Sequence, residues 1–482
     1  MKYGVVPKVL GNILLVESLL MVPPLIIAFY TNEYDKFGFL ITIIITSIIG
    51  FLMSKIKSFK NTINAREGLT IVTFGWLLAS LFGALPFYIS GSIPIYIDAF
   101  FETVSGLTTT GSTILSDVEV LPHASLFWRS FTHWIGGMGI LVFTVALLPA
   151  LGIGGFQIFK AESPGPSADK IAPRIKDTAK ILYTTYFTLT IVQIILLVLG
   201  GMSLFDSMLH TFGTVGTGGF GVKNSSIAFY ESSYIHIVIG IFMVISGVNF
   251  SLYYTLFKGK WREVFENEEL RLYLSIVSIA VLAIAVNLFM TSYESIFLAF
   301  RDAFFQVSSI ITTTGYATAD FDLWPSFSKA ILFTLMFIGG SAGSTAGGIK
   351  VIRILILTKL IKRDVAKIFH PRAYISIKNG NKIIPNETIV SINTFFALYI
   401  MIFVLSTILI SLEGLDLISA SSSVAATLGN IGPGLGFVGP VRNFGEFTFA
   451  SKALFSFLML LGRLELFTIL ALIVPKAWSR EV

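Results

Sequence analysis

The chain has 482 residues, of which 54% are hydrophobic and 13% are charged, and its mean hydropathy is +0.81. A soluble protein carries roughly twice that share of charged residues, so a soluble globular fold is excluded. The chain has no cysteine, which excludes disulfides, thiolate metal sites and cysteine nucleophiles, and its five histidines lack metal-ligand spacing. The composition predicts a polytopic membrane protein that binds no cofactor of its own.

The net charge of +6 is distributed unevenly along the chain. Of the 34 Lys and Arg residues, we assign 26 to one side of the membrane, seven to the other side and one to an apolar stretch. The 26 lie in the segments 2–8, 55–66, 160–180, 258–271, 350–382 and 476–480. Because basic loops stay in the cytoplasm, this asymmetry predicts a multi-pass protein of the cell (inner) membrane with both termini cytoplasmic. The basic residues thus face membrane lipid and cytoplasm, and we expect no nucleic-acid binding.

Apolar stretches in chain order predict ten spanning helices, since each is close to the ~20 residues that a helix needs to cross a bilayer. They cover roughly 9–30, 37–56, 68–90, 125–151, 179–200, 233–257, 272–292, 327–349, 388–411 and 451–475. The first stretch is long and has no cleavable-signal pattern, so we expect a retained helix. From the third helix on, the helices form four consecutive pairs.

A shorter apolar segment lies inside each pair, at 97–109, 205–216, 301–313 and 416–428. At about 1.5 Å per residue, such a helix reaches roughly halfway across a bilayer, which is typical of a re-entrant pore loop. The sequence therefore predicts an all-α polytopic membrane protein with four pseudo-repeats of helix, pore loop and helix around a central pore. The predicted units are a two-helix N-terminal extension at 1–60 and pore repeats at 68–151, 179–257, 272–362 and 388–475.

A glycine-containing phrase follows each short segment. The phrases are TTTGST around Gly111, GTGGF at Gly219, TTTGYA around Gly315 and NIGPGL around Gly432. An aspartate stands thirteen residues before the glycine in the first three copies and sixteen before it in the fourth, where Ser419 takes the equivalent place. We expect these aspartates to cap the half-helices, because a carboxylate suits the free amides of a helix start. They are Asp98, Asp206, Asp302 and Asp416.

The four phrases predict a ring of backbone carbonyls around an axis, the arrangement that replaces the water around a potassium ion in a pore. Glycine supplies backbone angles that residues with a Cβ avoid. The predicted potassium-binding residues are Thr109, Thr110, Gly111, Thr217, Gly218, Gly219, Thr313, Thr314, Gly315, Asn430, Ile431 and Gly432. Two registers stay open, with Gly218 as the alternative to Gly219 and Gly434 as the alternative to Gly432. Helix–helix contacts and turns are the competing interpretation of such small-residue phrases.

Ten consecutive small residues, five of them glycine, run from Gly339 to Gly348 in the third unit. Each glycine disfavours helix by about 1 kcal/mol relative to alanine. We therefore expect the helix to break here and a flexible loop to cross the ion path as a gate, whereas a close-packed helix interface is the alternative. The predicted gate glycines are Gly339, Gly340, Gly343, Gly347 and Gly348.

Arg463 lies within the last apolar stretch, and Glu465 follows two residues later. A buried arginine in a membrane span is costly and normally faces a cavity or a partner. We expect Arg463 to place a positive charge beside the permeation path and to oppose the glycine-rich loop. A structural pair with a glutamate or a carbonyl is the alternative. Lys350 and Arg353 are expected to mark the cytoplasmic boundary and to snorkel toward water.

Several stretches together resemble the Trk/Ktr/HKT superfamily of potassium transporters, and its TrkH/TrkG branch in particular. They are GLTTTGST, AESPGP…KIAPRIKDTAKILY over 161–183, SIITTTGYATADF, GGSAGSTAGGIKVIR and GRLELFT. The two extra N-terminal helices also fit this branch. The resemblance implies a homodimer with one pore per subunit, a potassium filter at the four glycines, a gating loop at Gly339–Gly348 and Arg463 opposing it.

The resemblance carries two further expectations. In plant relatives a serine at the first filter glycine goes with sodium selectivity, so Gly111 favours potassium. Members of the branch are regulated by a cytosolic ring of TrkA-like RCK subunits that bind NAD or ATP. No dinucleotide fingerprint occurs in this chain, so that sensor must be a separate protein.

The predicted function is potassium uptake through a selective, channel-like pore driven by the membrane potential. Proton- or sodium-coupled symport is an alternative, although Glu17, Glu102 and Glu465 are the few candidate carboxylates for a relay. A transporter of organic solutes usually has two related halves, which four short units argue against. A membrane enzyme needs a nucleophile–base pair or a metal cluster, and the sequence offers neither, so we predict that the chain is not an enzyme.

Overall fold

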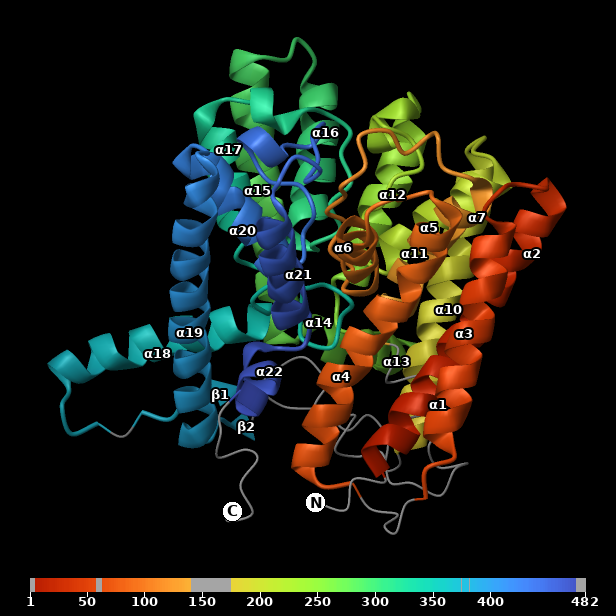
Figure 1. Cartoon of the computed structure of the whole chain (residues 1–482). Coiled ribbons are helices and arrows are strands. Elements are labelled where there is room, and N and C mark those ends of the chain that lie inside the picture. Colours follow the sequence, from red (N-terminus) through yellow and green to blue (C-terminus); the bar gives the residue numbers. More distant parts are fainter. Residues whose placement is uncertain (1–4, 58–62, 140–174, 374, 381, 474–482) are drawn as a thin grey trace.

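The computed structural model describes residues 5–57, 63–139, 175–373, 375–380 and 382–473 (Figure 1). The described part of the chain is mostly helical and contains one short antiparallel hairpin of β1 (Lys378–Asn379) and β2 (Lys382–Ile383). The predicted all-α class is confirmed apart from this hairpin. The end of the helix predicted at 125–151 and most of the segment 161–183 lie outside the described residues.

The N-terminal extension is a helical hairpin beside the rest of the molecule. Its helices are α1 (Val5–Leu20), α2 (Val22–Thr31) and α3 (Lys36–Ser54). Gly11 and Gly50 let α1 and α3 approach backbone to backbone, because a Cβ on Gly11 would overlap the carbonyl oxygen of Gly50. Small residues at a crossing point are how membrane helices pack closely.

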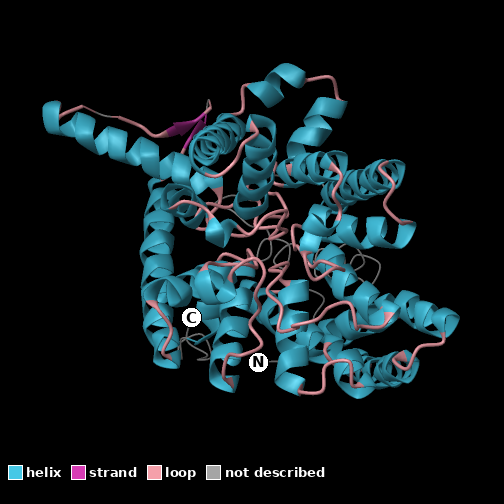
Figure 2. Cartoon of the chain, turned by 90° about the horizontal axis from the view of Figure 1, so that it is seen from above, coloured by secondary structure: helices cyan, strands magenta, loops and turns pink. Residues whose placement is uncertain are grey.

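The rest of the chain repeats one order of elements four times. A long helix opens each unit, a half-length helix follows it, and a second long segment closes it. The opening helices are α4 (Ala65–Gly83) with α5 (Leu85–Ser90), α10 (Ile175–Leu199), α15 (Glu268–Thr291) and α19 (Asn386–Ile410). The half-length helices are α6 (Tyr96–Leu107), α11 (Leu204–Val215), α16 (Ile296–Ile311) and α20 (Leu417–Leu428). Seen from above, loops meet at the centre of the molecule and helices surround them (Figure 2).

The closing segments are not the continuous helices that the sequence predicted. The predicted helix 233–257 is α12 (Ser233–Ser246) and α13 (Phe250–Phe257), which meet at 94°. The predicted helix 451–475 is α21 (Phe449–Arg463) and α22 (Leu466–Ile473), bent by 115°. In the third unit α17 (Ser326–Leu335) ends before the glycine-rich run, which agrees with the predicted break. Most of the predicted span 327–349 is therefore not helical. The first unit closes with α7 (His123–Gly137).

Glycines let two of the closing segments lie directly against half-length helices. A Cβ on Gly136 would overlap the carbonyl oxygen of Leu107, and a Cβ on Gly462 would overlap that of Leu428. Both carbonyls belong to the last residue of a half-length helix. The closing segments of the first and fourth units therefore meet the ends of the half-length helices backbone to backbone.

Six described helices are long and apolar enough to span a membrane, and eight if each bent pair is one span. These eight correspond to eight of the ten predicted spans. Of the predicted span 125–151 the structure describes only the residues up to Gly139, and in the predicted span 327–349 the helix α17 ends after ten residues.

Between the third and fourth units, α18 (Val351–Phe369) projects sideways from the bundle (Figure 1). The short helix α14 (Trp261–Phe265) connects the second and third units. The described part of the chain begins at α1 and ends at α22, and both ends lie on the same face (Figure 1), called the terminal face below.

Candidate functional site

All four half-length helices end with the same backbone turn. Each helix stops four residues before its phrase glycine, and the residue two before that glycine has a left-handed conformation. Those residues are Thr109 (φ 55°), Thr217 (57°), Thr313 (54°) and Asn430 (55°). The next amide in each unit bonds to the carbonyl five residues earlier, at 2.7–2.9 Å, which closes a Schellman-type cap. A β-branched residue rarely adopts this conformation, and such strain gathers at functional sites.

This shared turn fixes which residues are structurally equivalent. The glycines at positive φ in the four turns are Gly111 (83°), Gly219 (77°), Gly315 (90°) and Gly432 (106°). Gly218 and Gly434 do not have positive φ. The fourth phrase has asparagine where the others have threonine, and asparagine tolerates the left-handed conformation well.

The four glycines form a closed ring. A Cβ on Gly111 would overlap the carbonyl oxygen of Gly218, one on Gly219 that of Thr314, and one on Gly315 that of Ile431. A Cβ on Gly432 would lie 2.8 Å from the carbonyl oxygen of Thr110, which returns to the first unit. The backbones of neighbouring units therefore touch in the cyclic order one, two, three, four.

Four carbonyl groups in this ring have no partner. The oxygens of Thr110, Gly218, Thr314 and Ile431 accept no hydrogen bond from any described residue, although all four residues are buried. Buried backbone carbonyls are nearly always paired with protein groups or water. A set of four such carbonyls can accept hydrogen bonds from water or coordinate a cation.

Cavities of about 110 Å³ each lie on the two sides of the ring. One cavity lies on the side of the ring away from the terminal face, and it is lined by all four ring glycines and by the loops that follow them. Two of its basic side chains, Arg129 and Lys223, pair with Glu102 and Glu119. A hydrogen bond from the Asn224 amide and the ammonium of Lys223 hold the pKa of the Glu119 carboxyl below its usual value.

The aspartates have other roles than the predicted one, except in the fourth unit. Asp416 is a helix N-cap and accepts bonds from the amides of Ile418 and Ser419, both at 3.2 Å. Ser419 is therefore not the cap. In the first three units the capping prediction was wrong, because the helices begin earlier. Asp98 pairs with a lysine of α21, Asp206 accepts from a tyrosine hydroxyl, and Asp302 pairs with its neighbour Arg301.

The glycine-rich run forms a loop directly on the terminal side of the ring. The Gly347 amide donates to Thr313 Oγ1 at 2.6 Å, and a Cβ on Gly347 would lie 2.6 Å from the carbonyl oxygen of Gly429. Residues 343–348 of the loop line the cavity on this side. The loop therefore lies between the ring and the terminal face.

Both ends of this loop are held. Gly339 donates to the Ile349 carbonyl at 2.9 Å, so the two ends lie side by side. One carboxylate oxygen of Glu269 accepts from the amides of Ala342 at 2.7 Å and Ile352 at 3.1 Å. Glu269 thus ties the loop and the start of α18 to the start of α15.

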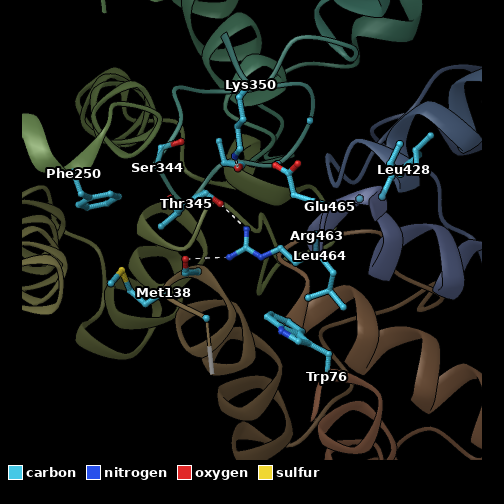
Figure 3. Close-up of a pocket in the computed structure, with 18 of the residues that line it drawn as sticks. Trp76, Met138, Phe250, Ser344, Thr345, Lys350, Leu428, Arg463, Leu464 and Glu465 are labelled. Carbon is cyan, nitrogen blue, oxygen red and sulfur yellow. Dashed lines mark hydrogen bonds between the residues drawn. The ribbon is translucent and has the colours of Figure 1, made fainter. Parts of the chain in front are cut away.

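Arg463 reaches the loop from the end of α21 (Figure 3). Its Nη1 donates to the Thr345 carbonyl at 2.8 Å, and its Nη2 donates to the carbonyls of Gly136 and, at 3.0 Å, Gly137. One guanidinium therefore joins the fourth unit, the loop of the third unit and the end of α7. This contact is the arginine–carbonyl arrangement that the sequence left open.

The snorkelling prediction for the two basic residues after the loop was wrong. Lys350 is buried and donates to the Ala346 carbonyl. Arg353 is buried, pairs with Glu465 and lies 3.8 Å from the centre of the Phe395 ring. Glu465 is therefore the partner of Arg353 rather than of Arg463.

The sequence analysis did not identify the contacts of four residues near the ring and the loop: Glu102, Arg129, His133 and Glu269. Each bonds to backbone far away in sequence, such as Arg129 to Gly221 at 2.9 Å. The one available signal was the presence of charged residues in otherwise apolar helices.

Fold and site together define a class of protein, a multi-pass membrane protein in which four pore-loop units surround one axis. A family model described as TrkH, a cation transport protein, matches residues 36–480. The chain is 40% identical over 483 residues to the Trk system potassium uptake protein TrkH of Escherichia coli (strain K12), covering 99% of this chain and 100% of that one. It is 36% identical over 480 residues to TrkG of the same strain, with 98% of each chain covered.

A solved structure agrees with these matches. The crystal structure of the potassium transporter TrkH from Vibrio parahaemolyticus superimposes with a TM-score of 0.89 at 37% identity, covering 99% of this chain and 100% of that one. The chain therefore belongs to the TrkH family of cation transport proteins. The resemblance inferred from motifs is confirmed, and so is the prediction that the chain is not an enzyme, since its relatives are named as uptake proteins.

Proposed function

We propose that the chain takes up potassium through a selective, channel-like pore along the axis of the four units. The observation that carries this proposal is the ring of four buried, unpaired carbonyls, from Thr110, Gly218, Thr314 and Ile431. Carbonyl oxygens at one level replace the hydration shell of K⁺. The names of the relatives, potassium uptake proteins, support the same cargo.

Electrostatics of the half-length helices favour a cation at this ring. Their carboxyl ends, at Leu107, Val215, Ile311 and Leu428, lie four residues from the ring glycines. A helix end of this kind carries a partial negative charge of about half an electron. The residues of the ring itself carry no formal charge, so the ion is attracted without being trapped. The membrane potential then drives uptake, at about 2.3 kcal/mol per charge for each 100 mV.

The glycine-rich loop and Arg463 form the gate in this proposal. The loop lies just below the ring, packs closely against Gly429 and lines the cavity on this side of the ring, so it lies in the ion path. Arg463 holds Thr345 of the loop and adds a positive charge to the path. Opening requires the loop to leave both the ring and this arginine.

Coupling to H⁺ or Na⁺ is the second candidate, and one residue keeps it open. Glu102 and Glu465 are held in ion pairs with Arg129 and Arg353, so neither is available as a relay. Glu17 is buried in α1, and neither of its carboxylate oxygens bonds to a described residue. A symport mechanism would rest on this carboxyl group.

Assembly and orientation complete the proposal. The terminal face is cytoplasmic, because the distribution of basic residues along the sequence assigns both termini to the cytoplasm. The chain forms a homodimer in the cell (inner) membrane and is regulated by a cytosolic TrkA-like subunit that binds NAD or ATP. The helix α18 projects from the bundle with Ile361, Ile368 and Phe369 exposed, which makes it a surface for such a partner.

The experiment is potassium uptake by the full chain in a bacterial strain that lacks its own potassium systems, with and without a TrkA-like subunit. Rescue of growth at low potassium is expected. Uptake that persists without a pH gradient and in sodium-free medium, while the membrane potential is maintained, supports the channel-like mechanism. Uptake that stops in wild type but continues in Glu17→Gln would support proton coupling instead, and no potassium uptake under any condition would overturn the proposal.

A further inference from the structure

A buried ion pair lies behind the ring, between the first and second units. Arg129 on α7 donates from Nε to Glu102 Oε1 on α6 at 2.6 Å, and the two side chains are 2% and 0% exposed. The Glu102 carboxylate also accepts from the Thr113 hydroxyl at 2.9 and 3.1 Å and from the Ile114 amide at 3.0 Å. Glu102 therefore holds the extended segment that follows Gly111.

Arg129, the other member of the pair, holds the extended segment that follows Gly219. Arg129 Nη1 donates to the Gly221 carbonyl at 2.9 Å, and the guanidinium lies 3.6 Å from the centre of the Phe220 ring. One helical turn further along α7, His133 accepts the Phe220 amide at Nε2, at 3.1 Å, and its Nδ1 lies 2.8 Å from the Gly106 carbonyl. The imidazole ring lies 4.2 Å from the Phe220 ring, so the aromatic ring is held between Arg129 and His133.

The second unit needs this support because it lacks a brace that two other units have. In the first and third units, a threonine hydroxyl pair spans the turn: Thr108 with Thr110 and Thr312 with Thr314, both at 2.8 Å. The equivalent positions in the second unit are Gly216 and Gly218, which have no side chain to bond.

The fourth unit has a brace of another kind. The Asn430 amide donates to the Thr110 hydroxyl and to the Met459 carbonyl, both at 2.9 Å. The second unit is thus the one in which the described side chains of the turn supply no such cross-connection. A backbone of three glycines and one threonine is otherwise the most flexible of the four.

The imidazole of His133 also explains why the second phrase contains Gly218. A Cβ on Gly218 would overlap the His133 ring. The sequence of the phrase and the side chains of α7 are therefore matched, since the glycine that removes the hydroxyl brace makes room for the histidine.

We propose that Glu102, Arg129 and His133 are positioning residues that set the ion selectivity of the pore by fixing the second segment of the ring through Phe220. This inference rests on the proposed potassium function. Discrimination between K⁺ and the smaller Na⁺ depends on the number and spacing of coordinating carbonyls. When Phe220 is released, the Gly218 carbonyl moves and the ring accepts Na⁺, while the pore still conducts.

The test uses the full chain in liposomes, with K⁺ and Na⁺ influx measured separately to give a selectivity ratio. Arg129→Lys keeps the charge but loses the planar fork that reaches both Glu102 and Gly221. Phe220→Leu keeps an apolar side chain and leaves the ion pair intact. We expect each variant to lower the K⁺/Na⁺ ratio by about tenfold, which corresponds to about 1.4 kcal/mol.

Asp98→Asn is the matched control, because Asp98 is on the same helix as Glu102 and pairs with Lys452 at 2.7 Å without touching the ring. Its ratio should equal that of wild type. Where a variant reconstitutes poorly, the flux is replaced by the Tm of the protein in detergent, measured once in K⁺ and once in Na⁺. Glu102, Arg129, His133 and Phe220 are together called the clamp, and the clamp variants Arg129→Lys and Phe220→Leu should show a smaller difference between the two Tm values than wild type.

Three results would overturn the inference in distinguishable ways. A wild-type protein that prefers K⁺, together with Arg129→Lys and Phe220→Leu variants that keep the wild-type ratio, overturns the clamp alone. A wild-type protein without preference for K⁺ overturns the potassium function and the clamp with it. A ratio that falls equally in Asp98→Asn would also contradict the clamp, since any lost ion pair would then have the same effect.

Discussion

Replacing Arg463 by glutamine should open the pore. The guanidinium holds the glycine-rich loop through the Thr345 carbonyl at 2.8 Å, and its other bonds go to Gly136 and Gly137 outside the loop. A hydrogen bond to a charged group contributes about 1.5–3 kcal/mol. Since about 1.4 kcal/mol is a factor of ten, losing this one bond should favour the displaced loop by about 10- to 100-fold.

The assay is potassium influx per molecule into liposomes, with protein amount measured in the same preparation. Arg301→Gln is the control, because Arg301 is an arginine whose own partners, Asp302 and Ser233, lie away from the loop. Influx should rise in Arg463→Gln and stay unchanged in Arg301→Gln. If Arg463→Gln conducts no more than wild type while remaining folded, the arginine does not hold the gate.

Three further changes test other parts of the structure. Gly219→Ala should abolish potassium preference or uptake, because its Cβ would overlap the Thr314 carbonyl oxygen; flux measurements check this. Glu269→Ala should raise influx, because the Ala342 amide of the loop and the Ile352 amide of α18 lose their common acceptor. Asp416→Ala should lower the free energy of unfolding by about 1 kcal/mol through loss of an N-cap, seen as a lower Tm.

Each of these changes has its own comparison. Gly201→Ala has the same backbone strain at φ 89° but open space around the new Cβ, so uptake should survive. Glu268→Ala removes a carboxylate that pairs with Lys359 and does not touch the loop. If Gly201→Ala and Gly219→Ala lose potassium uptake equally, backbone strain and not the overlap with the Thr314 carbonyl oxygen causes the loss. Unchanged influx in Glu269→Ala, or an unchanged Tm in Asp416→Ala, would contradict the corresponding contact.

The lengths of the apolar stretches and the positions of the glycines were enough to predict the repeated fold. Apolar length separates half-spanning from spanning helices, and the recurring glycines mark where each half-helix ends. The register in the second and fourth units could not be chosen from spacing alone. It depends on the left-handed residues Thr217 and Asn430, whose conformation only the folded turn reveals.

The missed features depend on contacts between distant parts of the chain. The break after Arg463 lies beside Gly462, which packs against the end of α20, and the break after Ser246 lies beside Gly247, which packs against Tyr273 of α15. Hydropathy carries no information on these contacts, so both segments were predicted as continuous spans. Lys350 and Arg353 follow the loop at a position where basic residues normally reach water. Their burial depends on partners at Ala346 and Glu465, and the latter is more than a hundred residues away.

The most direct test of the ring is to observe a cation in it. Crystals of the full chain grown with Tl⁺ or Rb⁺ give anomalous density that reports the position of the ion. The account predicts a peak on the axis, between the carbonyl oxygens of Thr110, Gly218, Thr314 and Ile431. Density confined to other places, in crystals of a protein that transports the same ion, would contradict the assignment of these four units to a potassium filter.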